Sequence, residues 1–117
     1  MYNKNKMIRL MEEEIPFNKK LGMKVISMEK GSCTLMIPWD ESLIGDPIRS
    51  AVHGGVISTL IDTAGGAACW SMLEGAEDRL STVDLRIDYL RRGPPEDLVC
   101  EAQVVRMGNR VAVARME

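Results

Sequence analysis

The spacing of hydrophobic residues changes several times along the chain, from helical to strand-like. In residues 4–15 apolar side chains recur at near-helical intervals until Pro16, which predicts a short amphipathic helix. Residues 23–28 are apolar with β-branched side chains, and residues 32–39 alternate between apolar and polar, with a glycine-containing turn between the two runs. These two segments predict an antiparallel hairpin. Residues 40–52 have the composition of a long loop.

Residues 54–73 predict a long helix that is apolar almost all round and therefore buried. Asp62 is its only charged residue before Glu74. Small and polar residues recur at steps of three and four and so share one stripe of this helix. They are Gly55, Ser58 or Thr59, Asp62, Gly66 and Cys69. Gly65 and Gly66 each cost about 1 kcal/mol relative to alanine inside a helix, so we expect a close contact there, most simply between two subunits.

Three further strands are predicted after this helix. Residues 80–90 alternate strictly, residues 97–107 follow, and residues 110–117 are still alternating where the sequence ends. One long helix framed by antiparallel strands predicts an α+β fold, a single domain over residues 1–117 in which one sheet curls around a buried helix. The last strand is an apolar edge, which favours pairing with another chain.

Composition removes several classes of function. With 15 Lys and Arg against 17 Asp and Glu, and no run of like charges, the chain has no electrostatic footprint for nucleic acid. No stretch approaches the length of a membrane span or of a signal peptide's apolar region, so we expect a cytoplasmic protein. Three separated cysteines and one histidine predict reduced thiols and no metal site. A 117-residue domain would gain stability from oligomerisation.

The strongest candidate for chemistry is Asp62, because a carboxylate in an apolar helix is costly to desolvate and needs a partner or a task. An ordinary ion pair or a wet interface would also explain it. Gly54 and Gly55 begin the same helix, where backbone N–H groups lack internal partners and lie at the positive end of the dipole. Such groups can polarise a carbonyl, although the glycines could equally form a tight turn.

Several other residues permit two interpretations. His53, the only histidine, could be a general base for a nucleophile such as Ser50 or Ser58, but we favour a scaffold role in which its ring holds the loop and the helix start. Guanidinium groups suit phosphate oxygens, yet charged turn residues are more often simply solvated. This applies to Arg91, Arg92 and Arg110. Methionines could line an acyl pocket but more often fill a core. They are Met23, Met28, Met36 and Met72.

The run Val52-His53-Gly54-Gly55-Val56, with an acid nine positions after the histidine, resembles the PaaI-like branch of the hot-dog thioesterases. The similar stretches are residues 15–18, 21–23, 45–47, 52–57, 60–64 and 83–91. The resemblance implies a homodimer, often paired into a homotetramer, with active sites built from both subunits. Members of this branch continue one strand beyond the position of Glu117, so the sheet is either cut short or completed differently.

The resemblance also implies roles for individual residues. Asp62 would be the nucleophile or the general base, and the Gly55 N–H of the other subunit would hold the thioester oxygen. Thr82 or a neighbour would position water. Asp46 stands where relatives often have an asparagine that orients the thioester, and a second carboxylate there should hinder unless it points away or is protonated.

The function predicted from the sequence is hydrolysis of an acyl-coenzyme A thioester, with no metal or redox cofactor. A non-catalytic acyl-CoA-binding protein is the alternative. A hydratase or dehydratase fits less well, since that chemistry usually needs a histidine beside the acid.

Overall fold

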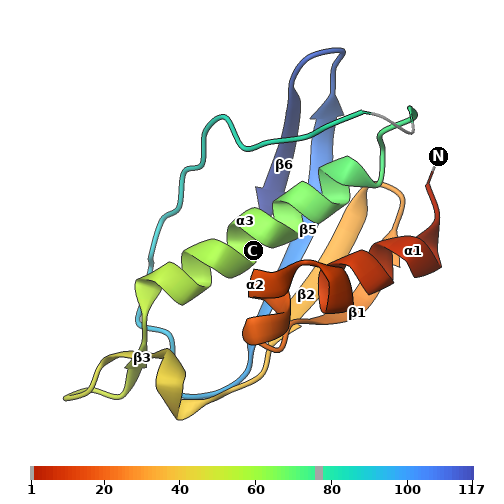
Figure 1. The fold of residues 1–117 in the computed structure, drawn as a ribbon. Helices are drawn as coiled ribbons and strands as arrows, with labels where there is room; N and C mark the ends of the chain where they lie inside the picture. The colour runs from red at the N-terminus through yellow and green to blue at the C-terminus, as the bar shows by residue number, and fades with distance from the viewer. Residues whose placement is uncertain (1, 76–77) are drawn as a thin grey trace.

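A computed structural model of the chain describes residues 2–75 and 78–117. Its main layer is a four-stranded antiparallel sheet in the order β1-β2-β5-β6, and the long helix α3 lies across one face of it (Figure 1). The sheet consists of β1 (Lys24–Glu29), β2 (Ser32–Ile37), β5 (Leu98–Met107) and β6 (Ala112–Met116), and α3 spans Gly54–Trp70. The α+β class and the single long helix are therefore confirmed.

The sheet follows from period-two patterns. On β2, Cys33, Leu35 and Ile37 are buried while the residues between them are half-exposed, so one face of the strand packs on α3. β5 pairs with β2 in register, with Leu35 opposite Cys100, and repeats the pattern. The turn at Gly31 between β1 and β2 has a φ of 89°, a conformation that glycine adopts without steric cost.

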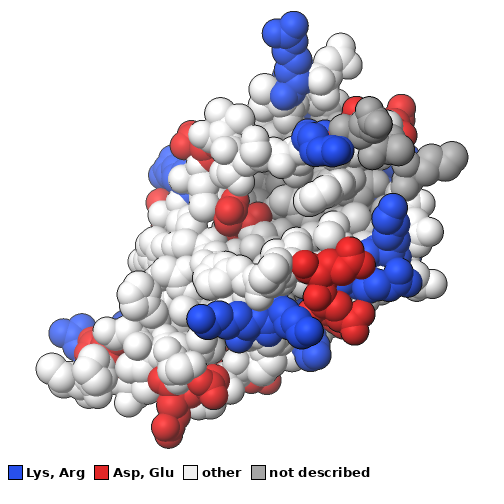
Figure 2. Space-filling model, in the orientation of Figure 1, with Lys and Arg blue, Asp and Glu red and all other residues white. Residues whose placement is uncertain are grey.

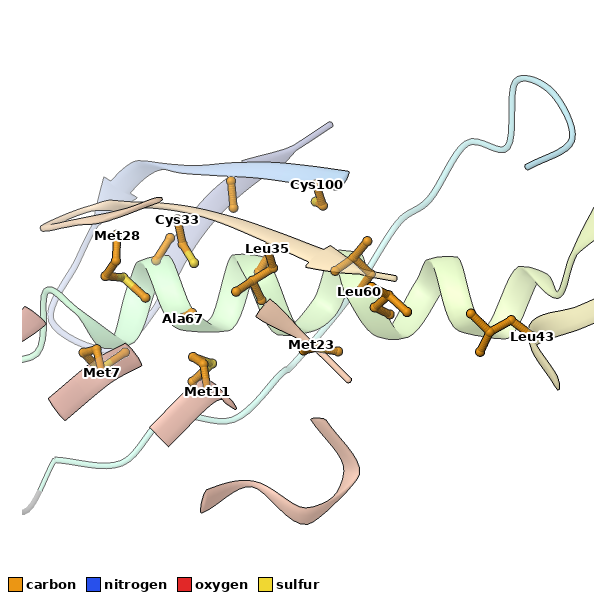
Figure 3. Close-up of a cluster of buried hydrophobic side chains, with 14 of the residues drawn as sticks. Met7, Met11, Met23, Met28, Cys33, Leu35, Leu43, Leu60, Ala67 and Cys100 are labelled. Atoms are coloured by element: carbon orange, nitrogen blue, oxygen red, sulfur yellow. The ribbon is translucent and has the colours of Figure 1, made fainter. Parts of the chain in front are cut away.

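The core lies on both sides of α3 (Figure 3). Met28, Cys33 and Leu35 approach it from the sheet, and Met7 and Met11 point toward it from the N-terminal helical segments. Met23 and Met28 belong to this core, so the core interpretation of these methionines holds. Within the described residues no helix is long and apolar enough to cross a membrane. Figure 2 shows cationic and anionic side chains mixed over the visible face.

The N-terminal region differs from the single helix predicted for residues 4–15. It contains α1 (Lys4–Arg9), one π-helical turn η1 (Leu10–Glu14) and a second helix, α2 (Pro16–Lys20). The prediction treated Pro16 as the end of helical structure. Proline is also favoured at the first position of a new helix, because its missing N–H would have no partner there, and it begins α2 in this way.

The predicted loop 40–52 contains more structure than its composition indicated. It holds a 3-10 turn, η2 (Glu41–Leu43), and the two short strands β3 (Ile44–Asp46) and β4 (Ala51–Val52), which pair with each other. This small second sheet leads directly into the first turn of α3.

The strand predicted for residues 80–90 is wrong. This segment forms no strand, and none of its backbone groups shares a backbone hydrogen bond with another described residue. The outer edge of β6 likewise has no neighbouring strand in the described sheet. Alternation of side chains indicates an extended conformation, but a strand also requires a partner edge, which the pattern does not identify.

The adjacent glycines 65 and 66 of α3 have different surroundings. A Cβ added to Gly65 would lie 2.8 Å from Met116 Sδ on β6, so the close contact predicted there lies within the chain. A Cβ added to Gly66 would meet no described atom within 4 Å. The expectation of a contact between subunits is therefore unnecessary at Gly65 and stays a prediction at Gly66.

Within a single chain the space at Gly66 is open, so without a subunit contact Gly66→Ala should raise the free energy of unfolding by about 0.5–1 kcal/mol through the higher helix propensity of alanine. Gly65→Ala gains the same propensity but crowds Met116, so it should be the less stable of the two variants. Urea denaturation monitored by circular dichroism measures both. A larger loss of unfolding free energy in Gly66→Ala than in Gly65→Ala would indicate that another chain contacts Gly66.

Candidate active site

The amino end of α3 is shaped by the short sheet in front of it. β4 delivers His53 to the N-cap position, and the His53 backbone N–H donates to the Leu43 carbonyl at 2.8 Å. His53, Gly54 and Gly55 are all exposed. The start of the helix therefore faces solvent, although Val52 immediately before it is buried.

The His53 side chain caps the helix that follows it. Its Nδ1 accepts a hydrogen bond from the Gly55 N–H at 2.8 Å. Two glycines make room for His53: a Cβ on Gly45 would lie 2.6 Å from the backbone Cα of His53, and a Cβ on Gly55 would lie 2.9 Å from Nδ1 of its ring. This contact is of the kind expected for a residue that holds the loop and the helix start together.

The Gly55 N–H, which the family resemblance implied as the donor to the thioester oxygen, thus already has an acceptor within the chain. Gly55 N–H donates to the His53 ring, and Val56 N–H donates to the His53 carbonyl at 2.9 Å. Gly54 N–H has no acceptor among the described residues. In the first turn of α3, Gly54 rather than Gly55 therefore offers a backbone donor that a ligand could use directly.

Asp62 lies further along α3 on its half-exposed side, so its carboxylate is not sealed in the core. The Thr82 hydroxyl donates to Asp62 Oδ1 at 2.7 Å. The extended segment that follows α3 therefore brings Thr82 to this carboxylate, and the role in positioning water that the resemblance implied for Thr82 stays a prediction. Oδ2 has no hydrogen-bond partner within the described chain, and it is free to meet a ligand.

Asp46 is held by its own loop. Its Oδ1 accepts hydrogen bonds from the backbone N–H groups of Ile48 at 3.0 Å and Arg49 at 3.2 Å, and its Oδ2 lies 3.6 Å from Arg49 Nε. These contacts direct the carboxylate toward the turn and pair it with a cation. The expected hindrance by a second carboxylate is reduced for this reason.

Three arginines surround a cleft of about 380 Å³ beside the start of α3. We call it the arginine cleft. Its lining residues are Asp46, Arg49, Ala51, Val52, Gly54, Ile57, Tyr89, Arg91, Arg92 and Gly93. For Arg91 and Arg92 the sequence left phosphate binding and simple solvation open, and both side chains line this cleft. Arg110 is not part of the cleft: it lies in the turn between β5 and β6, which Figure 1 shows at the top, far from β3.

The family model of the thioesterase superfamily matches residues 50–117, which include His53, Asp62 and Thr82 but not Asp46 or Arg49. The medium/long-chain acyl-CoA thioesterase YigI of Escherichia coli K12 is 37% identical over 115 residues, which cover 88% of this chain and 74% of that protein. The chain belongs to the thioesterase superfamily.

Solved structures agree with this assignment. A thioesterase-superfamily-related protein from Shewanella oneidensis has a TM-score of 0.87 at 28% identity and covers 97% of this chain and 82% of its own. The Escherichia coli PaaI protein of the phenylacetic acid degradation operon has a TM-score of 0.76 at 25% identity, with coverages of 97% and 88%. The predicted hot-dog fold and the PaaI-like branch are confirmed.

The sequence reasoning missed two contacts of this thioesterase site. The Tyr89 hydroxyl donates to the Gly54 carbonyl at 3.3 Å and also contacts the Ser58 hydroxyl. Ser58 in turn donates to the Gly54 carbonyl at 3.0 Å, so neither contact supports Ser58 as a nucleophile paired with His53. In the sequence Tyr89 falls within the predicted strand 80–90 and the similar stretch 83–91, with no role of its own. Its place shortly before Arg91 and Arg92 was the available signal.

The three cysteines are buried, as predicted. Burial raises the pKa of Cys33 to about 12 and that of Cys100 to about 11, so both remain protonated thiols at neutral pH. Burial also raises the pKa of Cys69. Across residues 2–75 and 78–117, no cluster of side chains is suited to hold a metal ion.

We expect Gly45→Ala to lower the free energy of unfolding by about 1–3 kcal/mol, because the added methyl group would collide with the His53 backbone and force β3 and β4 apart. Thermal unfolding followed by circular dichroism tests this. Gly66→Ala, the same substitution in open space, is the control. Equal midpoints for the two variants would contradict the packing described for His53.

Proposed function

We propose that this thioesterase hydrolyses acyl-coenzyme A thioesters. In this proposal Asp62 either activates the attacking water or itself attacks the thioester carbon. The observation that carries the proposal is the 2.7 Å hydrogen bond from Thr82 to Asp62 Oδ1, which fixes the carboxylate and leaves Oδ2 available. The acyl-CoA specificity of YigI, a relative 37% identical, supports this substrate class.

The chemistry needs only the chain, water and the substrate. As a general base, Asp62 removes a proton from water while the oxygen attacks the thioester carbon. As a nucleophile, it would instead form an acyl-enzyme anhydride that water then cleaves. In both cases the carbon–sulfur bond breaks and coenzyme A leaves as a thiolate, a good leaving group that needs little help from an acid. No metal or redox cofactor takes part.

The site we propose is assembled from two copies of the chain. Gly55 and Asp62 are seven residues apart, which places them about 10 Å apart along the helix axis at about 1.5 Å per residue. A carbonyl oxygen must lie about 3 Å from its donors while the adjacent carbon is attacked, so one helix does not serve both ends of the reaction. A homodimer, alone or within a tetramer, brings the amino end of one α3 to Asp62 of another.

In this arrangement the oxyanion that forms on the thioester is held at the amino end of α3. The positive end of the helix dipole favours developing negative charge there. Gly54 N–H is free to bind the oxygen, whereas Gly55 N–H reaches it only if the amide shares its hydrogen bond with His53 or the ring moves. Glycine at both positions permits the close approach of the substrate.

The arginine cleft is the proposed site for the coenzyme A phosphates. Arg49, Arg91 and Arg92 gather at its walls, and guanidinium groups bind phosphate oxygens through paired hydrogen bonds. Gly54 also lines the cleft, so a substrate held there by its phosphates can extend its thioester toward the helix start. Asp46 offsets part of the charge of Arg49.

We expect Asp62→Asn to lower kcat on acyl-CoA substrates at least 100-fold, because the amide neither accepts the proton nor attacks. Release of free thiol, trapped with a chromogenic disulfide, measures kcat, and calorimetric binding of acyl-CoA measures affinity. Retained binding with lost turnover would support the mechanism. Turnover within a few-fold of wild type would contradict it, and a wild-type protein that binds without releasing thiol would favour the non-catalytic alternative.

We expect Arg92→Ala to raise KM for acyl-CoA several-fold with little change in kcat, because a phosphate contact is lost while the reacting centre is untouched. The same variant should leave KM for the matching acyl-pantetheine unchanged, since that substrate lacks the nucleotide phosphates. Arg110→Ala, outside the cleft, is the matched control. An equal effect of Arg92→Ala on both substrates would argue against phosphate binding.

A further inference from the structure

The orientation of the His53 ring follows from its neighbours. A Cβ on Gly45 would lie 3.0 Å from Cδ2, and a Cβ on Gly55 would lie 2.9 Å from Nδ1 and 3.1 Å from Cε1. One side of the ring therefore faces β3 and the other faces the first turn of α3. Nε2 is the remaining atom, at the tip of the ring between Cδ2 and Cε1, and the residue as a whole is exposed.

The hydrogen bond at Nδ1 decides where the ring carries its proton. Nδ1 accepts from the Gly55 N–H at 2.8 Å, so Nδ1 itself is unprotonated. A neutral imidazole with an acceptor at Nδ1 has its hydrogen on Nε2. The exposed tip of His53 is therefore a hydrogen-bond donor, which is the opposite of what a general base requires.

His53 does not itself line the arginine cleft, but its two neighbours in the chain do. Val52 and Gly54, on either side of His53, both line the arginine cleft. Gly55 N–H belongs to the positive end of α3 and polarises the ring through Nδ1, which makes the Nε2–H a stronger donor. A neutral imidazole held against a helix amino end is an established means of polarising a carbonyl.

We propose that His53 is a catalytic residue of this enzyme, whose Nε2–H donates a hydrogen bond to the thioester carbonyl oxygen. Gly55 then acts through the ring, and Gly54 N–H supplies the direct backbone donor. This inference rests on the proposed thioester hydrolysis and changes the identity of one oxyanion donor. No proton is transferred from His53: the hydrogen bond strengthens as the carbonyl oxygen becomes negative and weakens when the carbonyl re-forms.

Two substitutions separate the capping role from the donor role. Asparagine is a strong N-cap residue and preserves an acceptor for the Gly55 N–H, but it is too short to place a donor at the position of Nε2. Glutamine extends far enough to place its amide N–H near that position but is a poor N-cap. His53→Asn should therefore keep the unfolding midpoint and lose activity, whereas His53→Gln should lose stability and keep more activity.

The experiment measures kcat, KM and the thermal midpoint of wild type, His53→Asn and His53→Gln, with all kinetics well below the lowest midpoint. We expect kcat of His53→Asn to fall about 10- to 100-fold with KM within threefold, and kcat of His53→Gln to lie between that of His53→Asn and wild type. Asn3→Ala is the matched control. It removes the N-cap of α1, where Asn3 Oδ1 accepts from Lys6 N–H at 3.0 Å, and should lower the midpoint without changing kcat.

Two results would overturn the inference: kcat of His53→Asn within threefold of wild type, or kcat of His53→Gln at or below that of His53→Asn. Either would leave His53 as a helix cap only. Asp62→Asn, assayed alongside, keeps the two proposals apart. If it is inactive while His53→Asn is active, only the role of His53 fails, and if Asp62→Asn itself turns over, the proposed hydrolysis fails.

Discussion

The close packing of α3 on the sheet is the contact on which the rest of this molecule depends. Gly65 of α3 faces Met116 of β6, and beside it on the helix surface Ala64 and Ala68 are fully buried with only methyl side chains, so the helix axis can approach the strands closely. Larger residues fill the sheet side, with Leu35 and Ile37 fully buried. Interiors are packed as densely as organic crystals, which means that this helix has little freedom to slide or rotate against the strands.

Because the helix is fixed in this way, the positions of the Asp62 carboxylate and of the amino end of α3 are fixed as well. The sheet covers the side of α3 that carries Gly65, and Asp62 and Gly66 on another side of the helix are left half-exposed. The amino end is fixed separately, by β4 and by the contact of His53 with Gly45. The carboxylate and the positive helix end thus belong to one rigid element and remain too far apart to share one carbonyl, which is why the proposed site needs a second copy.

Much of this arrangement could be predicted from the sequence, because the spacing of apolar residues along the chain indicates which face of a strand or helix is buried. The pattern of Cys33, Leu35 and Ile37 predicted one buried face of a strand, and Asp62 stood out because its neighbours on the helix are apolar. Residues 80–90 show where local reasoning fails: their alternation is real, but a ladder depends on an edge elsewhere in space. Pro16 was misassigned because proline both ends one helix and begins another.

The site was harder to predict than the fold, since its contacts join distant residues. Nothing local reveals that Arg49 rather than Arg110 lies beside Arg91, or that Tyr89 reaches Gly54. Asp46 was expected to disturb the oxyanion, and only its bonds to the backbone of its own turn show where its charge is directed.

The burial of all three cysteines has a consequence for an enzyme that would make a thiol with every turnover. Exchange between a protein thiol and a small disulfide proceeds through an exposed thiolate, and neither exposure nor ionisation is available to Cys33 or Cys100. A disulfide of coenzyme A, which forms where an oxidant is present, would find no exposed thiolate on the native fold to attack it. The catalyst is thereby protected from covalent capture by the oxidised form of its own product.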